Sequence, residues 1–386
     1  MGPYVTQMLG DFGAEVIKVE APEGDILRGI GPHGQQRMGP LFLNLNRNKR
    51  SIVLDLKSAG GKTAFLKLAE TADVLVYNVR PAAMQRLGLG YEALRAVNPR
   101  LIYVGTFGFS QRGRYAAEAA FDDLIQAAVA IPAAMAENSG DIPRYVPTAI
   151  ADRSVGLYAL GVICAALVAR ARSGIGQAID VPMFETMTNF VLGDHLYGET
   201  FVPAEGGMGY PRMMTPERRP YKTRDGYVCC VVYTDGQWRG FLDLIGEGDL
   251  FDSDPRFVDI GARTRHIADL YQLLGKALEA RTTAEWRRDL GAIGITVFPM
   301  NTFETLLEDP HLADIGFFTE VEHPSEGTLR SMACPSEWSG TPPGVPRPAP
   351  RIGEHSREIL AEIGYDAAAI AALEQAGVTR GTEWLP

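Results

Sequence analysis

Strand-like and helix-like segments alternate along the N-terminal part of the chain, and this alternation restricts the possible folds more than any other feature. Strand-like runs cover residues 14–20, 50–56, 73–79 and 101–109, and helix-like runs cover 58–72 and 91–100. Ser58 stands where it would cap the first of these two helices. Strands joined by crossover helices pair in parallel. The order predicts an α/β fold with a Rossmann-like parallel sheet domain.

The length of the chain and a change in composition near residue 200 predict a second domain. A chain of 386 residues is long for a single core. A polar stretch rich in Gly, Met, Pro and Arg covers 203–219, and a hairpin turning at Asp225-Gly226 follows it. We expect a large α/β domain to begin with residues 1–200. A smaller α+β domain covers 201–310, and a C-terminal segment, 311–386, returns to the large domain.

Charge and composition exclude several classes of partner. The formal net charge of −10 argues against binding nucleic acid. The four cysteines and six histidines show no metal-ligand spacing, so no metal is expected. The longest apolar run, Val155–Val168, is shorter than the roughly 20 residues of a membrane span, and no signal peptide is visible. These features predict a soluble, cytoplasmic protein.

Asp152 stands at the head of that apolar run, in a segment expected to form a buried helix. One interpretation is a helix cap, with the carboxylate accepting the amides of Ser154 or Val155. The other is a nucleophile, since a helix N-terminus favours negative charge and carboxylates can act in covalent catalysis. The residues alone leave both open.

Basic residues follow or flank several of the predicted strands. Gathered at the carboxyl edge of a sheet, they would suit a phosphate-bearing ligand, although each could be a solvated loop charge. No GxGxxG or GxxxxGK[ST] motif follows a strand, so a standard phosphate loop is not expected. The cluster comprises Arg47, Lys49, Arg50, Lys57, Arg80, Arg86 and Arg100.

Several segments together resemble the class III CoA-transferases, the CaiB/BaiF family that includes formyl-CoA transferase. They are "GDFGAEVIKVE" (10–20), "NRNKRSIVLDLKS" (46–58), "ADVLVYNVRPAAMQRLGLGYEALRAVNPRLIYV" (72–104) and "DRSVGLYALGVICAALVARARSGIGQAIDV" (152–181). The resemblance covers nearly the whole chain. It implies an interlocked homodimer that moves CoA from an acyl-CoA to a free carboxylic acid. The implied route passes through an aspartyl-acyl anhydride and an aspartyl-CoA thioester on Asp152.

The resemblance also implies roles for individual residues. Asp122 would orient groups around the catalytic Asp152. Tyr77 and Val79 depart from the family's usual "ENFRPG" pattern, and Ala21 replaces a frequent basic residue. The family's usual first strand would precede Met1, so we expect that strand to be missing or supplied otherwise. The residues that match CoA-binding positions are Leu54, Lys57, Asn78, Val79, Arg80, Arg86 and Phe121.

Two alternatives stay open. A 2-methylacyl-CoA racemase of the same fold would need a second acid/base, but Phe121 stands where related racemases carry His. A non-catalytic CoA-binding homologue would lack transfer altogether. The acids are not identified by the sequence, although Arg212, Arg218 and Arg219 would suit a dicarboxylate.

Overall fold

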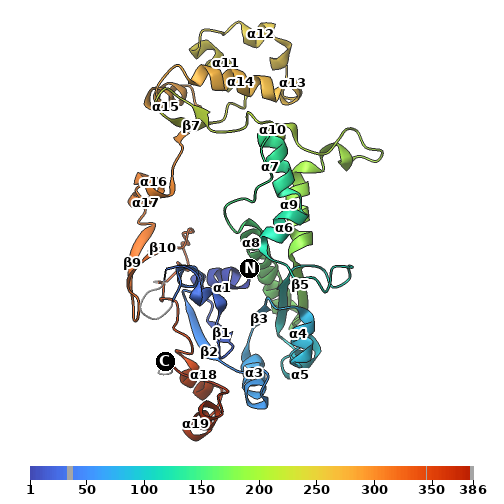
Figure 1. Ribbon diagram of the computed structural model, residues 1–386, viewed down its shortest axis with the longest axis vertical. Helices are drawn as coiled ribbons and strands as arrows, with labels where there is room; N and C mark the ends of the chain where they lie inside the picture. The colour runs from blue at the N-terminus through green and yellow to red at the C-terminus, as the bar shows by residue number, and fades with distance from the viewer. Residues whose placement is uncertain (33–37, 345, 383–386) are drawn as a thin grey trace. The chain divides into compact units, whose positions relative to one another are not determined.

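The computed structural model describes residues 1–32, 38–344 and 346–382, which belong to two compact units (Figure 1). The first unit comprises residues 1–126, 148–187 and 310–386, and the second comprises 127–147 and 188–309. The second unit therefore includes chain that precedes the expected boundary at residue 201. The reason is that helix α7 (Ile131–Ser139) packs on α10 (Pro211–Met214), where Asn138 Nδ2 donates to the Met213 carbonyl at 2.6 Å.

The first unit is built on parallel strands, as predicted. Strands β3 (Val74–Tyr77), β4 (Ile102–Phe107) and β5 (Ala178–Pro182) form one sheet with β4 in the centre. Strands β1 (Val16–Glu20) and β2 (Lys49–Val53) form a separate parallel pair. The α/β class is confirmed, although the predicted strands lie in two sheets within the described residues.

The crossover helices of this unit follow local sequence signals. Helix α3 (Ala59–Thr71) begins after Ser58, whose Oγ accepts the Gly61 amide at 3.0 Å, so the predicted cap is confirmed. Helices α4 (Pro81–Arg86) and α5 (Tyr91–Val97) connect β3 to β4. Every residue of β4 is buried, as expected for a central parallel strand. The main core of the unit includes Ile52, Leu54, Phe65, Leu89, Leu94, Tyr103, Ile359 and Leu360.

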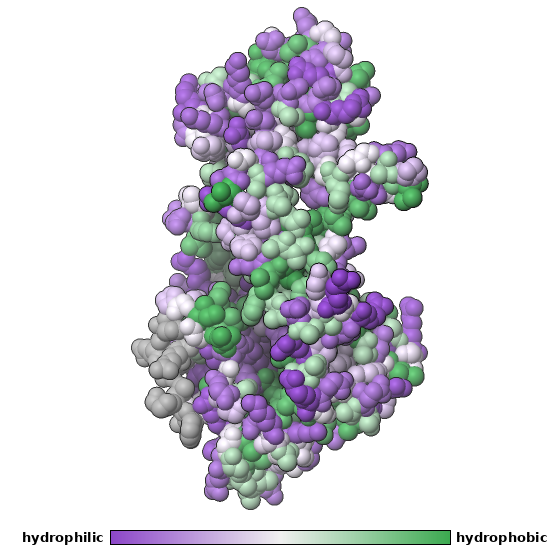
Figure 2. Space-filling view, turned by 45° about the vertical axis from the view of Figure 1, so that its right-hand side comes forward, coloured by the Kyte–Doolittle hydropathy of each residue, from purple (hydrophilic) through white to green (hydrophobic). Residues whose placement is uncertain are grey.

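Helix α8 (Ile150–Ser173) carries the long apolar run, but it is buried on one face only. Val155, Ala159 and Ile163 are fully buried, and the helix packs against α1 (Gly2–Asp11) and β4. Leu157, Tyr158 and Val168 are 53%, 57% and 55% exposed. Apolar side chains also reach the surface elsewhere on the chain (Figure 2). The expectation of a fully buried helix is wrong for the single chain, because a helix apolar on all sides gives no sign of which face is covered.

Among the described residues, α8 is the helix whose length and apolar composition would be sufficient to cross a membrane. The sequence predicted no span, because the apolar run Val155–Val168 is shorter than the roughly 20 residues that a span needs. Length and composition are weak evidence for a span, since core helices of soluble proteins also meet both criteria.

The C-terminal segment packs on the first unit. Strands β9 (Phe318–His323) and β10 (Gly327–Met332) form an antiparallel hairpin, and helices α18 (Ser356–Glu362) and α19 (Ala367–Gln375) follow. The His355 amide donates to the Ser51 carbonyl at 2.9 Å, and Thr379 Oγ1 donates to the Val53 carbonyl at 2.7 Å. Pro350 is also held by this unit of the same chain, since Arg28 Nη1 donates to its carbonyl at 3.1 Å.

The second unit has its own core and an antiparallel sheet. Strands β6 (Tyr221–Lys222), β7 (Tyr227–Cys230) and β8 (Val297–Pro299) pair in that order. The predicted hairpin turn at Asp225-Gly226 is confirmed by the bond from the Thr223 amide to the Gly226 carbonyl at 2.9 Å. Helices α11 (Asp235–Leu244), α14 (Ile267–Leu278) and α15 (Thr283–Ala292) share one hydrophobic core with this sheet. The core includes Trp238, Phe241, Phe257, Leu270, Leu274 and Trp286.

Candidate active site

Asp152 lies in the first turn of α8, two residues after the helix begins at Ile150. Its side chain is 39% exposed, and its Oδ1 lies 3.3 Å from the Met1 amino nitrogen. The helix has Ala149 at its N-cap position and no side-chain cap. The cap interpretation is therefore wrong, because Asp152 lies inside the first turn of the helix and not at the N-cap position. A negative charge in the first turn of a helix interacts favourably with the helix dipole.

Asp122 accepts the backbone amide of Asp152, which lies in the first turn of α8, where backbone amides have no acceptor within the helix. Its Oδ1 accepts the backbone amide of Asp152 at 2.8 Å, and its Oδ2 accepts from Gln126 Nε2 at 2.7 Å. Asp122 is the first residue of α6 (Asp122–Ala128), so two helix starts meet at this pair. The Asp122 carboxylate therefore holds the backbone of Asp152, whose own Oδ1 accepts from the Met1 amino group.

The CoA-binding candidates after β2 lie in different environments. Leu54 is 1% exposed and belongs to the core, so only its backbone is available to a ligand. Lys57 is exposed on the turn before α3, where its amide donates to Asp55 Oδ1 at 3.0 Å.

The candidates after β3 are all exposed. Asn78 and Arg80 follow the strand directly, Val79 between them is 46% exposed, and Arg86 ends α4. Arg80 Nη1 donates to the Ala117 carbonyl at 3.2 Å. Ala117 belongs to the loop of residues 108–120, which leads directly to Phe121 and Asp122 and is here called the β4 loop. Arg80 therefore connects the end of β3 with the segment that carries Asp122.

Phe121 is 72% exposed immediately before α6. The β4 loop that precedes it is closed at its base, since a side chain at Gly108 would overlap Ala120. Closure at the base places both ends of the loop beside Asp122. The exposed ring of Phe121 has no group that could exchange a proton.

Four of the basic residues grouped in the sequence analysis are structural. Arg47 forms a buried double hydrogen bond with Asp11 (2.8 and 2.6 Å), and Arg50 pairs with Glu358 and Glu362. The Lys49 ammonium donates to two backbone carbonyls and to Asn46, and burial holds the pKa of Lys49 well below its usual value.

Arg100 lies two residues before β4, at the edge of the sheet opposite the carboxyl ends of the strands. Its Nη1 donates to the Gly174 carbonyl at 3.2 Å. The prediction that these four join a phosphate site is wrong. Apart from Leu45 and Asn46, which accept from Lys49, their partners are distant in sequence, so a count of charges could not identify them.

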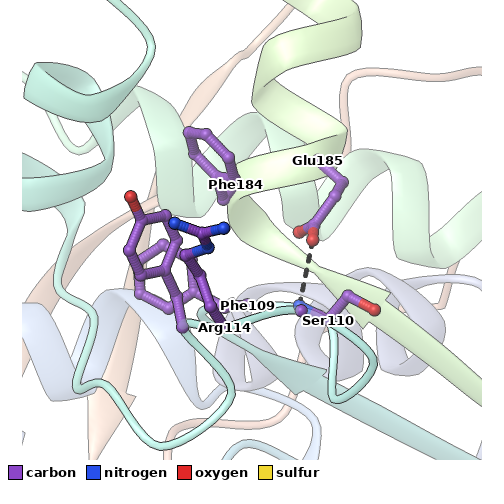
Figure 3. A pocket seen from close by; sticks show the side chains of 7 residues that line it. Phe109, Ser110, Arg114, Phe184 and Glu185 are labelled. Carbon is purple, nitrogen blue, oxygen red and sulfur yellow. Dashed lines mark hydrogen bonds between the residues drawn. The ribbon is translucent and has the colours of Figure 1, made fainter.

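A pocket that the sequence analysis missed opens at the carboxyl edge of β4 and β5 (Figure 3). Its volume is about 400 Å³, and it lies between the β4 loop and the start of α9 (Met183–His195). Glu185 accepts the Ser110 amide at 3.1 Å. The motif "GFSQRGRY" was visible in the sequence, but only the fold brings it to Phe184 and Glu185. The lining residues are Phe109, Ser110, Gly113, Arg114, Tyr115, Phe184 and Glu185.

The three arginines considered for a dicarboxylate lie in the second unit, and two of them are already engaged. Arg212 Nε donates to the Tyr271 hydroxyl at 2.8 Å, and Arg219 pairs with Glu217 at 3.0 Å. Arg218 is exposed. The described residues contain no group of three or more His, Cys, Asp or Glu side chains placed to hold a metal ion.

Comparison with known proteins gives consistent matches over most of the chain. The model of the family described as CoA-transferase family III matches residues 1–356. An acyl-CoA transferase of Fusarium pseudograminearum is 34% identical over 98% of this chain and 85% of its own length. The succinate–glutarate CoA-transferase of Agrobacterium fabrum is 33% identical over 94% of this chain and 92% of its own. The crystal structure of a CaiB/BaiF family protein from Brucella suis superposes with a TM-score of 0.75 at 30% identity, over 94% of this chain and 95% of that one.

Proposed function

The chain belongs to CoA-transferase family III, and from this premise we propose that it moves CoA from an acyl-CoA to a free carboxylic acid with Asp152 as the nucleophile. The observation that carries the proposal is the carboxylate of Asp152 in the first turn of α8, with its backbone held by Asp122 at 2.8 Å. An ionised carboxylate held at a fixed place is what covalent acyl transfer requires. CoA enters as a substrate, bound as its acyl ester.

The proposed route alternates between two covalent forms of Asp152. Its carboxylate oxygen attacks the thioester carbonyl, the C–S bond breaks, and an aspartyl-acyl anhydride and CoA thiolate form. The thiolate attacks the aspartyl carbonyl, which releases the donor acid and leaves an aspartyl-CoA thioester. The acceptor carboxylate attacks this thioester, and the freed thiolate then takes the new acyl group and restores Asp152.

Asp122 serves in this route as a positioning residue. It takes the Asp152 amide with one oxygen and the Gln126 side chain with the other, so the start of α8 is tied to the start of α6. Fixing the nucleophile in the attacking geometry lowers the barrier, and small displacements are costly. An anhydride must also be shielded from water. Because Asp152 is 39% exposed in the single chain, the shield has to come from bound substrate or from a second subunit.

The CoA ester is proposed to bind along the carboxyl ends of β2 and β3. Exposed Lys57, Arg80 and Arg86 supply positive charge there, and Asn78, Val79 and the Leu54 backbone supply the remaining contacts. Guanidinium and ammonium groups bind phosphates through charge-assisted hydrogen bonds. Phe121, 72% exposed beside Asp122, offers an apolar surface to the acyl end of the ester.

The exposed face of α8 supports the proposed homodimer. Leu157, Tyr158 and Val168 are each more than half exposed on a helix whose other face is in the core. An apolar face of this kind marks an interaction surface, and a second copy of the chain is the partner that the family suggests. We also propose a cytoplasmic location, because the four cysteines are free thiols, as is usual in a reducing compartment.

The racemase reading is not favoured. Racemisation needs acid/base groups on both sides of an α-carbon, and Phe121 stands beside Asp122 where a second such group is required.

A panel of acyl-CoAs and free acids tests the function. Each donor is incubated with each acid, and the CoA products are identified by mass spectrometry. We expect at least one new acyl-CoA whose formation depends on both substrates. If no pair gives transfer while CoA esters still bind, the chain is a CoA-binding homologue without catalysis.

A further inference from the structure

The pocket between the β4 loop and α9 is lined by three aromatic rings, one arginine and one glutamate. Phe107 and Pro182 pair in register at the ends of β4 and β5, so both pocket-forming segments leave the sheet at the same edge. Ligands of open α/β sheets bind at this edge. The β4 loop also ends at Ala120, two residues before Asp122, so the segment that forms one wall of the pocket leads directly into α6 of the proposed catalytic pair.

Three aromatic rings form the apolar part of the pocket. The ring centroid of Phe109 lies 5.5 Å from that of Tyr115 and 5.7 Å from that of Phe184. Tyr115 and Phe184 meet edge to face at 6.5 Å. These spacings are those of attractive ring contacts, and a fourth ring can join such a group edge-on or in an offset stack. The apolar part therefore suits a flat aromatic body.

Arg114 is the cation among the residues that line this pocket. Among the described residues it takes part in no ion pair, whereas Arg112, two residues earlier, interacts electrostatically with Asp180. Figure 3 shows Arg114 on the Phe109 side of the pocket and the Glu185 carboxylate near Ser110. A guanidinium of this kind binds a carboxylate through two parallel hydrogen bonds.

Glu185 restricts the charge that the pocket accepts. Its carboxylate accepts the Ser110 amide at 3.1 Å and stands at the pocket wall as a negative charge. A second carboxylate on the ligand would be repelled there. One cation and one anion around three rings suit a monocarboxylate with an aromatic body better than an aliphatic dicarboxylate.

We propose that this pocket binds the acceptor acid and that the acceptor is an aryl or arylalkyl monocarboxylate, held by Arg114 and by the rings of Phe109, Tyr115 and Phe184. The inference rests on the proposed transferase function for the role of the acid. Its carboxylate oxygen attacks the carbonyl carbon of the aspartyl-CoA thioester, and the C–S bond breaks to give a mixed anhydride and CoA thiolate. The thiolate then attacks the acyl carbon of the acid, and the C–O bond to Asp152 breaks.

Binding is tested first, without CoA, by ¹⁹F NMR of 4-fluorophenylacetate added to the full chain. We expect the wild type to broaden the signal, phenylacetate to compete, and succinate not to compete. Arg114→Gln should weaken binding about tenfold or more, because a charge-assisted pair is lost. Arg112→Gln is the matched control and should leave binding unchanged. Absence of broadening in the wild type, or equal effects of the two variants, would overturn the inference.

Transfer is tested second, with phenylacetate, acetate and succinate as acceptors for one acyl-CoA. We expect phenylacetate to have the highest kcat/KM and Arg114→Gln to remove that preference while the KM for the CoA ester stays the same. If only aliphatic acids accept CoA, the inference fails and the transferase function stands. If 4-fluorophenylacetate binds through Arg114 but no acid ever accepts CoA, the binding site stands and the transferase function fails.

Discussion

At the scale of single residues, the proposed transfer mechanism needs two carboxylates, Asp152 and Asp122, in different roles. Asp152 keeps its carboxylate 39% exposed for reaction, and Asp122 uses both of its oxygens in hydrogen bonds to Asp152 and Gln126. A group whose two oxygens are engaged is suited to hold other groups, and a group left accessible in the first turn of a helix is suited to react. The division of labour follows from the contacts of each side chain.

Replacement of Asp122 separates positioning from folding. Asp122→Ala removes the acceptor for the Asp152 amide, so we expect kcat to fall by about 10²-fold with little change in the KM for the CoA ester. Asp122→Asn keeps one carbonyl oxygen that can accept this amide and should recover much of the loss. Steady-state kinetics of both variants give the measurement. Equal activity of Asp122→Ala and wild type would remove the positioning role.

Residue roles were predictable from the sequence where local geometry decides them. The Ser58 cap depends on neighbours three residues away and was predicted correctly. The roles of Arg47 and Arg50 depend on Asp11 and on Glu362, which come close only in the folded chain. Asp152 was interpretable as a cap because that interpretation starts α8 three residues too late, at residue 153 instead of Ile150.

At the scale of elements, the ends of the parallel strands set the candidate site. The turns after β2 and β3 present Lys57, Arg80 and Arg86 in exposed positions, and the β4 loop connects to them through the bond from Arg80 to the Ala117 carbonyl. The strands and their crossover helices were predicted from periodicity. The pocket was not, because its walls come from segments about 70 residues apart, after β4 and after β5.

Arg86 tests the proposed CoA site at this scale. Arg86→Ala should raise the KM for CoA esters roughly tenfold or more, since a charge-assisted hydrogen bond contributes about 1.5–3 kcal/mol. The KM for the acid should change little. Arg95→Ala, an exposed arginine on the neighbouring helix α5, is the matched control and should behave as wild type. Identical KM values for the two variants would place the CoA phosphates elsewhere.

At the scale of the whole molecule, the exposed apolar face of α8 is the main evidence for a second subunit. This helix was expected to be buried, but the single chain buries only one face of it. Apolar composition reports that a surface is to be covered, but not whether the cover comes from the same chain. In the proposed homodimer, each chain would bury the exposed apolar face of α8 of the other chain.

The oligomeric state tests this reading. We expect the wild type to elute as a dimer, and no folded monomer to be recovered on dilution. Leu157→Glu together with Val168→Glu should prevent dimer formation, because two charges would be buried in an apolar contact. Val97→Glu, at a 39% exposed site on α5, is the control and should leave the dimer intact. Light scattering after size exclusion gives the mass, and a monomeric wild type at micromolar concentration would contradict the proposal.

The central claim, covalent transfer through Asp152, is tested most directly by peptide mass spectrometry of the enzyme after incubation with an acyl-CoA and no acceptor acid. We predict that the peptide containing Asp152 carries the added mass of CoA as a thioester, that hydroxylamine converts it to the aspartyl hydroxamate, and that Asp152→Ala shows neither product while remaining folded. An enzyme that transfers CoA at full rate with an unmodified Asp152 peptide, or an Asp152→Ala variant with normal turnover, would contradict the account.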